Sequence, residues 1–140
     1  MPHDLEAIKH LFENDHFGAT CGIRLVELRP GFAKTVLVND DRHLNRVGTI
    51  HGGAIFTLAD SAFGAATKTG GKVTLAVNTT ISFVKAARSG TLYAEATEIA
   101  RSRKLSTCTV RVTDESGDLI ALFQGTAYIK DEPFPPGGNQ

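Results

Sequence analysis

The feature that most constrains the fold of this chain is an apolar segment with a single carboxylate at its middle. Residues 52–68 read GGAIFTLADSAFGAATK, and a glycine pair at 70–71 follows them. Apolar residues lie around most of the helical circumference, and Gly-Gly is a common helix stop, so the segment predicts one buried helix. A helix of this kind has to be covered on most sides by other elements. Asp60 at its centre then needs a physical reason.

Helical geometry places Asp60 away from the most apolar stripe of this segment. At about 100° per residue, the stripe largely opposite Asp60 consists of Ile55, Leu58, Ala62 and Ala66. The residues on the same side as Asp60 are Phe56, Thr57, Phe63 and Gly64. Uncovered phenylalanines are typical of a subunit interface, where a carboxylate is costly unless it is paired or has a function. The alternative is that this side faces water, or that a neighbouring Ser, Thr or Arg satisfies the carboxylate.

The sequence before the central helix predicts a short helix, a hairpin and a loop. Apolar residues recur at helical spacing within residues 4–13, with Asp4 as the N-cap. Residues 22–39 contain two β-type runs joined at Arg29-Pro30-Gly31, where proline presets one turn dihedral and glycine allows a positive φ. The polar residues 39–49 predict a loop.

Four strand-like runs follow the central helix. Turn-forming residues separate them and favour an antiparallel meander, and the runs cover residues 73–86, 91–101, 105–114 and 119–129. We therefore expect an α+β fold, in which a curved antiparallel sheet wraps around helix 52–68. A single domain is expected over residues 1–130. The Pro- and Gly-rich residues 131–140 predict a disordered tail.

Composition and missing motifs narrow the function. Lys plus Arg and Asp plus Glu each number 15, so no overall field attracts nucleic acid. No apolar run approaches the ~20 residues of a membrane span, and the first residues lack a signal-peptide pattern, so we expect a soluble, cytoplasmic protein. Cys21 and Cys108 stand alone, and the five histidines include no HExxH pair. With GxSxG and phosphate-binding glycine loops also absent, we expect neither a metal site nor a serine nucleophile.

The entrance to the helix adds a second feature. His51-Gly52-Gly53 puts two residues without side chains at a turn where backbone N–H groups lack helical partners and the helix dipole is positive. This arrangement suits a developing oxyanion. The alternative is that the glycines only permit a tight turn.

Distance decides how the carboxylate and this turn can cooperate. Eight residues at ~1.5 Å each separate Asp60 from Gly52 by about 12 Å, which is too far for both to hold one small group. Two such helices packed antiparallel about a two-fold axis would bring Asp60 of one chain to the turn of the other. The sequence therefore predicts a dimer with two identical composite sites.

Asn45, Gly48 and the His51-Gly52-Gly53 turn, followed by Leu58-Ala59-Asp60, form the pattern N-x-x-G-x-x-H-G-G and then L-A-D. This pattern resembles the motif of hotdog-fold acyl-CoA thioesterases, specifically the phenylacetic acid degradation (PaaI-like) subgroup. The later runs TTISFVKAARSGTLYAEATEI and TVRVTDESGDLIALFQGTAYI fit the family pattern, so that the resemblance spans roughly residues 15–130. The combined motif is fairly specific, whereas His-Gly-Gly alone is weak.

The resemblance implies a fold, a reaction and a set of residues. The sheet wraps around a central helix, dimers form through a continuous sheet, and dimers often pair into tetramers. The reaction is hydrolysis of an acyl-CoA thioester, with no cofactor beyond the CoA of the substrate. Asp60 is implied as the nucleophile or as the base that activates water, and the Gly52 amide as the donor that polarises the carbonyl. Asn45 and His51 are implied to orient the reacting groups.

Further residues are expected to contact the substrate: Gly53, Thr57, Asn78, Lys85, Arg101, Arg103 and Lys104. The cations at 101–104 lie in a turn between strands, where flexible side chains can meet the phosphates of CoA, and the alternative is a solvated charged turn. Lys85 and Arg88 at the preceding turn are weaker candidates.

One strand position departs from the family pattern. Similar enzymes often carry Ser or Thr early in the strand after the helix, to hold water or the carboxylate, and Ala76 stands near that point. Asn78, two residues on, is expected on the same face of the strand and is one substitute. Thr74 is the other.

Two other functions remain open. A hotdog hydroxyacyl dehydratase also uses a His and an acidic residue across a dimer, but Asn45 and Gly52 suit a thioester carbonyl better. A non-catalytic acyl-CoA sensor would leave Asp60 as a costly residue without a function. Hydrolysis of an aromatic or medium-chain acyl ester is therefore the leading hypothesis.

Overall fold

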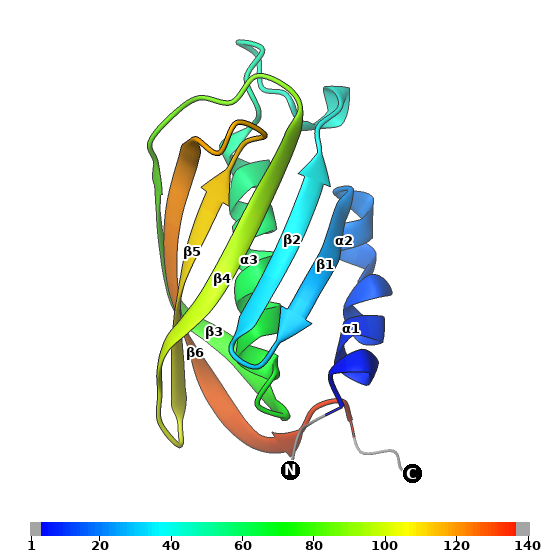
Figure 1. Ribbon diagram of the computed structural model, residues 1–140, viewed down its shortest axis with the longest axis vertical. Coiled ribbons are helices and arrows are strands. Elements are labelled where there is room, and N and C mark those ends of the chain that lie inside the picture. Colours follow the sequence, from blue (N-terminus) through cyan, green and yellow to red (C-terminus); the bar gives the residue numbers. More distant parts are fainter. Residues whose placement is uncertain (1–3, 137–140) are drawn as a thin grey trace.

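The computed structural model describes residues 4–136 as a curved sheet wrapped around one long helix (Figure 1). The helices are α1 (Leu5–Glu13), α2 (His16–Thr20) and α3 (Gly52–Lys68), with a 3₁₀ turn, η1, at Asp41–His43. The strands are β1 (Ile23–Arg29), β2 (Phe32–Val38), β3 (Lys72–Phe83), β4 (Thr91–Arg101), β5 (Leu105–Thr113) and β6 (Leu119–Pro133). All paired strands are antiparallel, and their order in the six-stranded sheet is β1-β2-β4-β5-β6-β3. The α+β fold with a central helix is confirmed.

Most of the expected elements are present. α3 begins and ends where the apolar segment predicts, and the hairpin of β1 and β2 turns at Gly31, whose φ is +72°. The Asp4 carboxylate accepts a hydrogen bond from Ala7 N at 3.1 Å and so caps α1. α2 was not expected, because five residues are too few to show a helical period, although Asp15 caps it as Asp4 caps α1.

The expected meander is wrong for its first strand. β4, β5 and β6 do follow one another, but β3 pairs with β6 at the far edge, and β2 is the neighbour of β4. The reason lies in residues 84–90, which cross the open end of the sheet instead of turning back. Val84 N and Lys85 N donate to Ile120 O at 2.9 and 3.2 Å, and Ala87 O accepts from Ile50 N at 2.7 Å. These bonds satisfy the backbone of the crossing segment.

The expected tail is also wrong in part. β6 continues through Pro133, and Phe134 N donates to Gly71 O at 2.9 Å. The Phe134 ring packs edge-on against Phe12 of α1, with 6.4 Å between the centroids. The apolar ring and this backbone bond hold residues 131–134 against the rest of the domain, and residues 137–140 lie outside the described part of the chain.

The core forms where the sheet covers α3. The predicted apolar stripe is fully or almost fully buried and consists of Ile55, Leu58, Ala62 and Ala66. The expectation that Phe63 lies on an uncovered face is wrong, because only 2% of this residue is exposed. Its ring packs against Phe123 of β6 at 5.5 Å, and the half-buried Phe56 ring lies 5.6 Å from the same partner.

Gly125 of β6 lets the Phe63 ring reach the sheet. A Cβ at this position would lie 2.8 Å from Phe63 Cζ and 3.0 Å from Phe123 Cε1, closer than side chains pack. Gly125→Ala should therefore lower the free energy of unfolding by about 1–3 kcal/mol through overpacking. Thermal unfolding at one fixed protein concentration measures the loss.

The matched comparison is Gly125→Ala in a Phe63→Leu background, where the shorter side chain leaves room. The cost of the alanine should be smaller there than in the wild type. An equal cost in both backgrounds would show that the contact with Phe63 is not the cause.

Candidate active site

The turn at His51-Gly52-Gly53 has almost all of its backbone groups bonded. His51 N donates to His43 O at 2.6 Å, and His51 O accepts from Ala54 N and Ile55 N at 3.0 and 3.2 Å. The His51 ring is the N-cap, since its Nδ1 accepts from Gly53 N at 2.8 Å. Gly52 N–H has no acceptor within residues 4–136. The helix thus presents one unused donor at its positive end.

Gly52 is also held against an aromatic ring. A Cβ at Gly52 would lie 3.2 Å from Cζ of Phe83, the last residue of β3, so the ring would have to move for a larger residue to fit. Gly52, Phe83 and Lys85 share a hollow with the backbone of residues 84–87. A side chain at Gly52 would therefore require a small shift of the exposed Phe83 ring.

Asn45 organises the loop beside this turn. Its Oδ1 accepts from Val47 N at 3.0 Å and Thr49 N at 3.1 Å, and its Nδ2 donates to Thr49 Oγ1 at 2.7 Å. Asn45 and His51 line one hollow, together with Leu44, Arg46 and Val47. The structure therefore brings Asn45, His51 and the Gly52 turn together, as expected, and adds the exposed Arg46, which lies at a variable position of the motif and gave no signal of its own.

Asp60 lies about 12 Å further along α3, on its incompletely covered side. Positions on this side recur every three or four residues and are exposed or half-buried: Gly53, Thr57, Asp60, Gly64 and Lys68. Within residues 4–136, the Asp60 carboxylate accepts no hydrogen bond and forms no ion pair shorter than 4 Å. Burial raises the pKa of the Asp60 carboxyl, and the positive charge of Lys68 opposes that shift. Asp60 is therefore a carboxylate poorly compensated by its own chain.

Lys68 is held near the other end of the same side. Its ammonium lies over the rings of Phe12 and Phe134, 5.9 and 5.8 Å from the centroids. The Nζ atom is 3.9 Å from the point where a Cβ on Gly64 would lie, so the side chain extends back along the helix toward Asp60. Burial lowers the pKa of Lys68, and the Asp60 charge opposes this.

Thr74 and Asn78 of β3, the two candidates for holding a catalytic water, lie in different surroundings. Thr74 is buried, and its hydroxyl lies 2.7 Å from that of Thr67, so it ties β3 to the end of α3. Asn78 does not share the face of Ala76, because a bulge between them shifts the register. Ala76 pairs with the buried Ala127, and Asn78 pairs with the neighbouring Thr126 on the opposite face.

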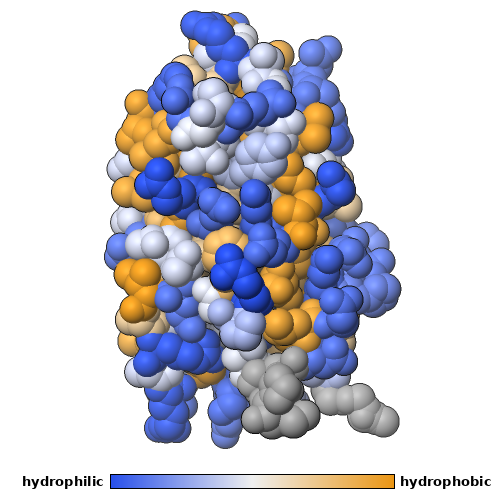
Figure 2. Space-filling view, viewed as in Figure 1, coloured by the Kyte–Doolittle hydropathy of each residue, from blue (hydrophilic) through white to orange (hydrophobic). Residues whose placement is uncertain are grey.

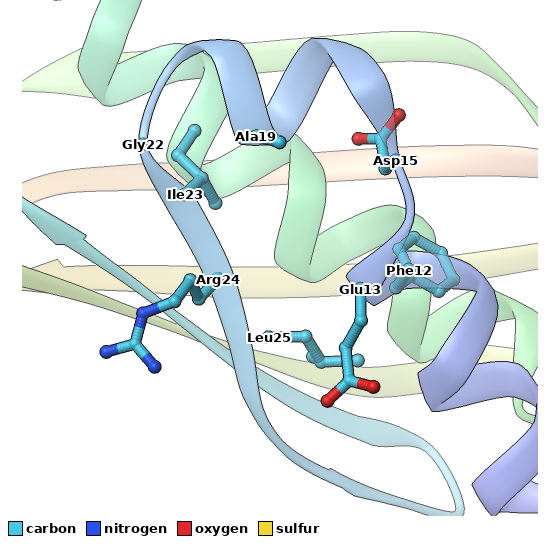
Figure 3. Close-up of a pocket in the computed structure, with 8 residues that line it drawn as sticks. All are labelled: Phe12, Glu13, Asp15, Ala19, Gly22, Ile23, Arg24 and Leu25. Carbon is cyan, nitrogen blue, oxygen red and sulfur yellow. The ribbon is translucent and has the colours of Figure 1, made fainter.

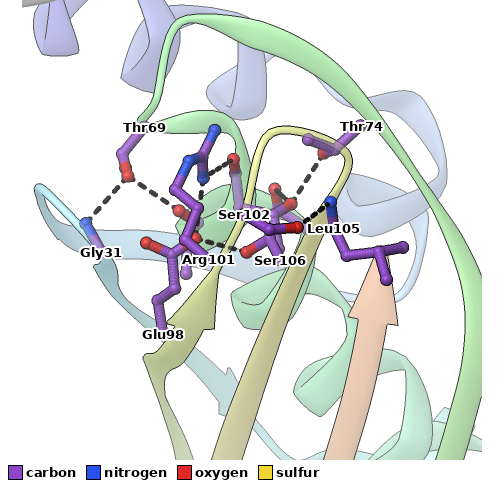
Figure 4. A network of polar contacts seen from close by, with 11 residues as sticks. Gly31, Thr69, Thr74, Glu98, Arg101, Ser102, Leu105 and Ser106 are labelled. Atoms are coloured by element: carbon purple, nitrogen blue, oxygen red, sulfur yellow. Dashed lines mark hydrogen bonds and ion pairs between the residues drawn. The ribbon is translucent and has the colours of Figure 1, made fainter. Parts of the chain in front are cut away.

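Arg101 is bonded to its own chain, although its side chain is partly exposed. Its Nη1 donates to Glu98 Oε2 at 2.7 Å and approaches Thr67 O at 3.4 Å, and its guanidinium covers Gly70. Figure 4 shows this network, in which the Ser106 hydroxyl also donates to Glu98 and Thr69 accepts from Gly31 N. The expectation that Arg101 is a flexible cation for phosphates does not fit these contacts. Its guanidinium instead links β4 to the end of α3.

The other expected cations are available to different degrees. Lys85 is paired with Asp118, and that hydrogen bond raises its pKa. Lys104 Nζ donates to the Tyr128 hydroxyl at 3.2 Å. Arg103 is exposed and forms no ion pair within the described residues. Of the cluster at 101–104, Arg103 is thus the side chain with the fewest contacts.

A separate hollow lies between α1, α2 and β1 (Figure 3). Phe12, Ile23 and Leu25 form its apolar part, and Glu13 and Arg24 stand at its rim, but it contains none of the expected site residues. Among residues 4–136, no three His, Cys, Asp or Glu side chains are grouped as metal ligands. No helix in that range has the length and apolar character needed to cross a membrane.

Comparison with known proteins adds a family to this geometry. The model of the thioesterase superfamily matches residues 47–121. A putative esterase of Archaeoglobus fulgidus is 39% identical over 134 residues, covering 94% of this chain and 87% of that protein. The acyl-coenzyme A thioesterase PaaI of Escherichia coli is 29% identical over 119 residues, covering 84% of this chain and 85% of that protein.

Solved structures agree in fold. The E. coli PaaI protein from the phenylacetic acid degradation operon superposes with a TM-score of 0.87 at 26% identity, covering 91% of this chain and 94% of that one. A Streptococcus mutans protein bound to acetyl CoA superposes with a TM-score of 0.74 at 25% identity, covering 77% of this chain and 88% of that one.

The contacts of Arg101 generate a prediction that separates structure from substrate binding. Arg101→Ala should lower the free energy of unfolding by about 1–2 kcal/mol, because it leaves the half-buried Glu98 carboxylate without its cation. Arg103→Ala is the matched control and should change stability by less than about 0.5 kcal/mol. Denaturant unfolding of both variants measures the difference, and equal stabilities would contradict the structural role of Arg101.

Proposed function

The chain belongs to the thioesterase superfamily and to its PaaI-like subgroup, and on that basis we propose that it hydrolyses an acyl-CoA thioester to the free acid and CoA. The observation that carries this proposal is the unused Gly52 N–H at the start of α3, beside a hollow lined by Asn45 and His51. A thioester carbonyl is an acceptor that gains negative charge during hydrolysis, which is what such a donor stabilises.

In the proposed reaction, the carbonyl oxygen accepts a hydrogen bond from Gly52 N–H. Asp60 of a second chain then acts in one of two ways. As a general base it takes a proton from water, whose oxygen bonds to the carbonyl carbon while the C–S bond breaks and CoA leaves as a thiolate that is then protonated. As a nucleophile its carboxylate oxygen bonds to the carbonyl carbon while the C–S bond breaks and CoA leaves as a thiolate that is then protonated, and water hydrolyses the resulting acyl-enzyme anhydride. Both routes need an ionised, poorly solvated carboxylate.

The free edge of β3 supports the second chain. β3 pairs only with β6, so one side of this long strand has no partner within the described chain. Its exposed apolar side chains include Leu75 and Val77, at 56% and 61% exposure. On the side where β3 and β6 lie, at the left of Figure 2, apolar patches lie among the polar surface residues. A long apolar edge of this kind is normally covered, and a second β3 would extend the sheet across a dimer.

We place the polar arm of CoA along the cationic rim of this site. Arg46 lines the hollow with Asn45 and His51, and Lys85, which is paired with Asp118, lines the one with Gly52, so both hollows offer polar side chains to this arm. Arg103 and Lys104 remain candidates for the phosphates at the far end of the molecule. The proposal also includes a homotetramer built from two dimers and an acyl group of aryl or short to medium-chain type. It includes a cytoplasmic location as well, because the free thiols of Cys21 and Cys108 fit a reducing compartment.

Asp60 provides the direct test of the reaction. Asp60→Ala and Asp60→Asn should each lower kcat by about 10²-fold or more, because both remove the base or nucleophile. Thiol release from a panel of acyl-CoA esters measures kcat, and circular dichroism confirms the fold. Native-like variants that keep more than a few per cent of the wild-type rate would move the catalytic role to another residue.

The pH dependence adds a second readout. The reactive form of Asp60 is the ionised one, and burial disfavours that form, so its pKa lies above the ordinary value near 3.9. The wild-type kcat/KM should accordingly fall on acidification at a higher pH than an ordinary aspartate would give. The residual activity of Asp60→Asn should lack this acidic limb.

A further inference from the structure

A hollow of about 460 Å³ lies between α2 and the first turn of α3, and its size is within the ~300–1,000 Å³ typical of small-molecule sites. Phe17 and Thr20 of α2 form one side, and the other side is formed by His51, Gly53, Ala54 and Thr57. Cys21, Arg42 and His43 complete the lining. In Figure 1, α2 lies beside the start of β1. The hollow thus reaches the residues on both sides of Gly52.

The polar side chains in this lining are almost all occupied by bonds within the chain. Arg42 pairs with Asp40 at 3.1 Å and donates from Nη1 to Thr20 O at 2.8 Å. His43 has both ring nitrogens bonded, with Nδ1 accepting from Asp40 N at 2.9 Å and Nε2 lying 2.6 Å from Cys21 O. His43 therefore has no free ring nitrogen and Arg42 is held by Asp40 and Thr20, while the surface that the lining exposes to the hollow is mostly apolar.

The hydroxyl groups follow the same rule. Thr57 donates to Gly53 O and Thr20 donates to His16 O, each at 2.8 Å. Phe17, in contrast, is 66% exposed at the rim, although it is a large aromatic residue. A hollow whose exposed lining is mostly apolar and whose rim is an uncovered ring favours an apolar ligand.

We propose that this hollow takes the apolar acyl group of the substrate, with Phe17 as the residue that determines specificity. The inference rests on the proposed thioesterase function, which puts the thioester carbonyl at Gly52 N–H. From that point the ester extends in two directions, one polar and one apolar. The hollows on the Asn45 side and the Phe83 side expose more polar surface than the Phe17 hollow, whose Arg42 is paired with Asp40, and therefore suit the polar CoA arm better. The hollow with Phe17 is left for the acyl group.

The test compares an ester with a large apolar acyl group and one with almost none. Phe17→Ala should lower the ratio of kcat/KM for phenylacetyl-CoA to that for acetyl-CoA by about 10-fold, as expected for loss of an apolar pocket wall. Ala54→Leu, which fills the hollow from α3, should lower the same ratio by a different route. Ile99→Ala is the control, because Ile99 is also a large exposed apolar residue, at 56%, but lies on β4 near the opposite end of α3.

The outcomes separate this inference from the proposed function. An unchanged ratio in folded Phe17→Ala and Ala54→Leu would overturn the acyl pocket. If the ratio is unchanged because kcat/KM falls equally for both esters, the CoA arm occupies the hollow instead. If the wild type hydrolyses no ester, the proposed function fails, and calorimetric binding of phenylacetyl-CoA and acetyl-CoA to the same variants then tests the hollow. A ratio of Kd values that shifts about 10-fold with Phe17→Ala supports the pocket in that case, and an unshifted ratio overturns it.

Discussion

The sheet packs around α3 but leaves one side of that helix incompletely covered, and the candidate site depends on this arrangement. Ile55, Leu58 and Ala62 are buried against the strands, while Asp60 and Lys68 lie on the side the strands do not cover. α1 and α2 flank that side, with the Phe12 ring beside Lys68 and α2 forming a hollow with the first turn of α3. The same packing that stabilises the core thus presents a carboxylate whose own chain offers it little compensation.

The chemistry of the site follows from which polar groups are already bonded. The His51 cap and the loop ordered by Asn45 satisfy their own donors and acceptors, and Gly52 N–H is left over. Asp60 keeps its carboxylate without a hydrogen bond from any described residue. Unpaired groups of this kind lower stability and are retained where a reaction uses them. One chain holds the donor and the carboxylate about 12 Å apart, so the proposed reaction needs a second chain to supply the carboxylate.

The sequence predicts the parts of this molecule that depend on local pattern. The bounds of α3, the turn at Gly31 and the side occupied by Asp60 follow from helical period and turn chemistry, and all agree with the structure. Strand pairing depends on contacts between distant segments, which local sequence patterns do not reveal. The sequence therefore predicts β3 beside β4, whereas β3 lies beside β6. The face of Asn78 was wrong for a similar reason, since a bulge breaks the alternation on which the expectation rested. Arg101 shows the same limit, because its partner Glu98, three residues earlier, would lie on the opposite face of a regular strand, and a bulge between Glu98 and Ala100 interrupts that alternation.

A complementation measurement tests most directly the central claim that each site combines two chains. Asn45→Ala disables the half-site that contains the Gly52 turn, and Asp60→Ala disables the other half. Coexpression with different tags isolates the heterodimer, in which one site carries both defects and the other carries neither. If two chains build each site and the sites act independently, two inactive parents should give a heterodimer with about half the wild-type activity per dimer. A purified heterodimer as inactive as its parents would contradict the account, because Asn45 and Asp60 would then serve one site from the same chain.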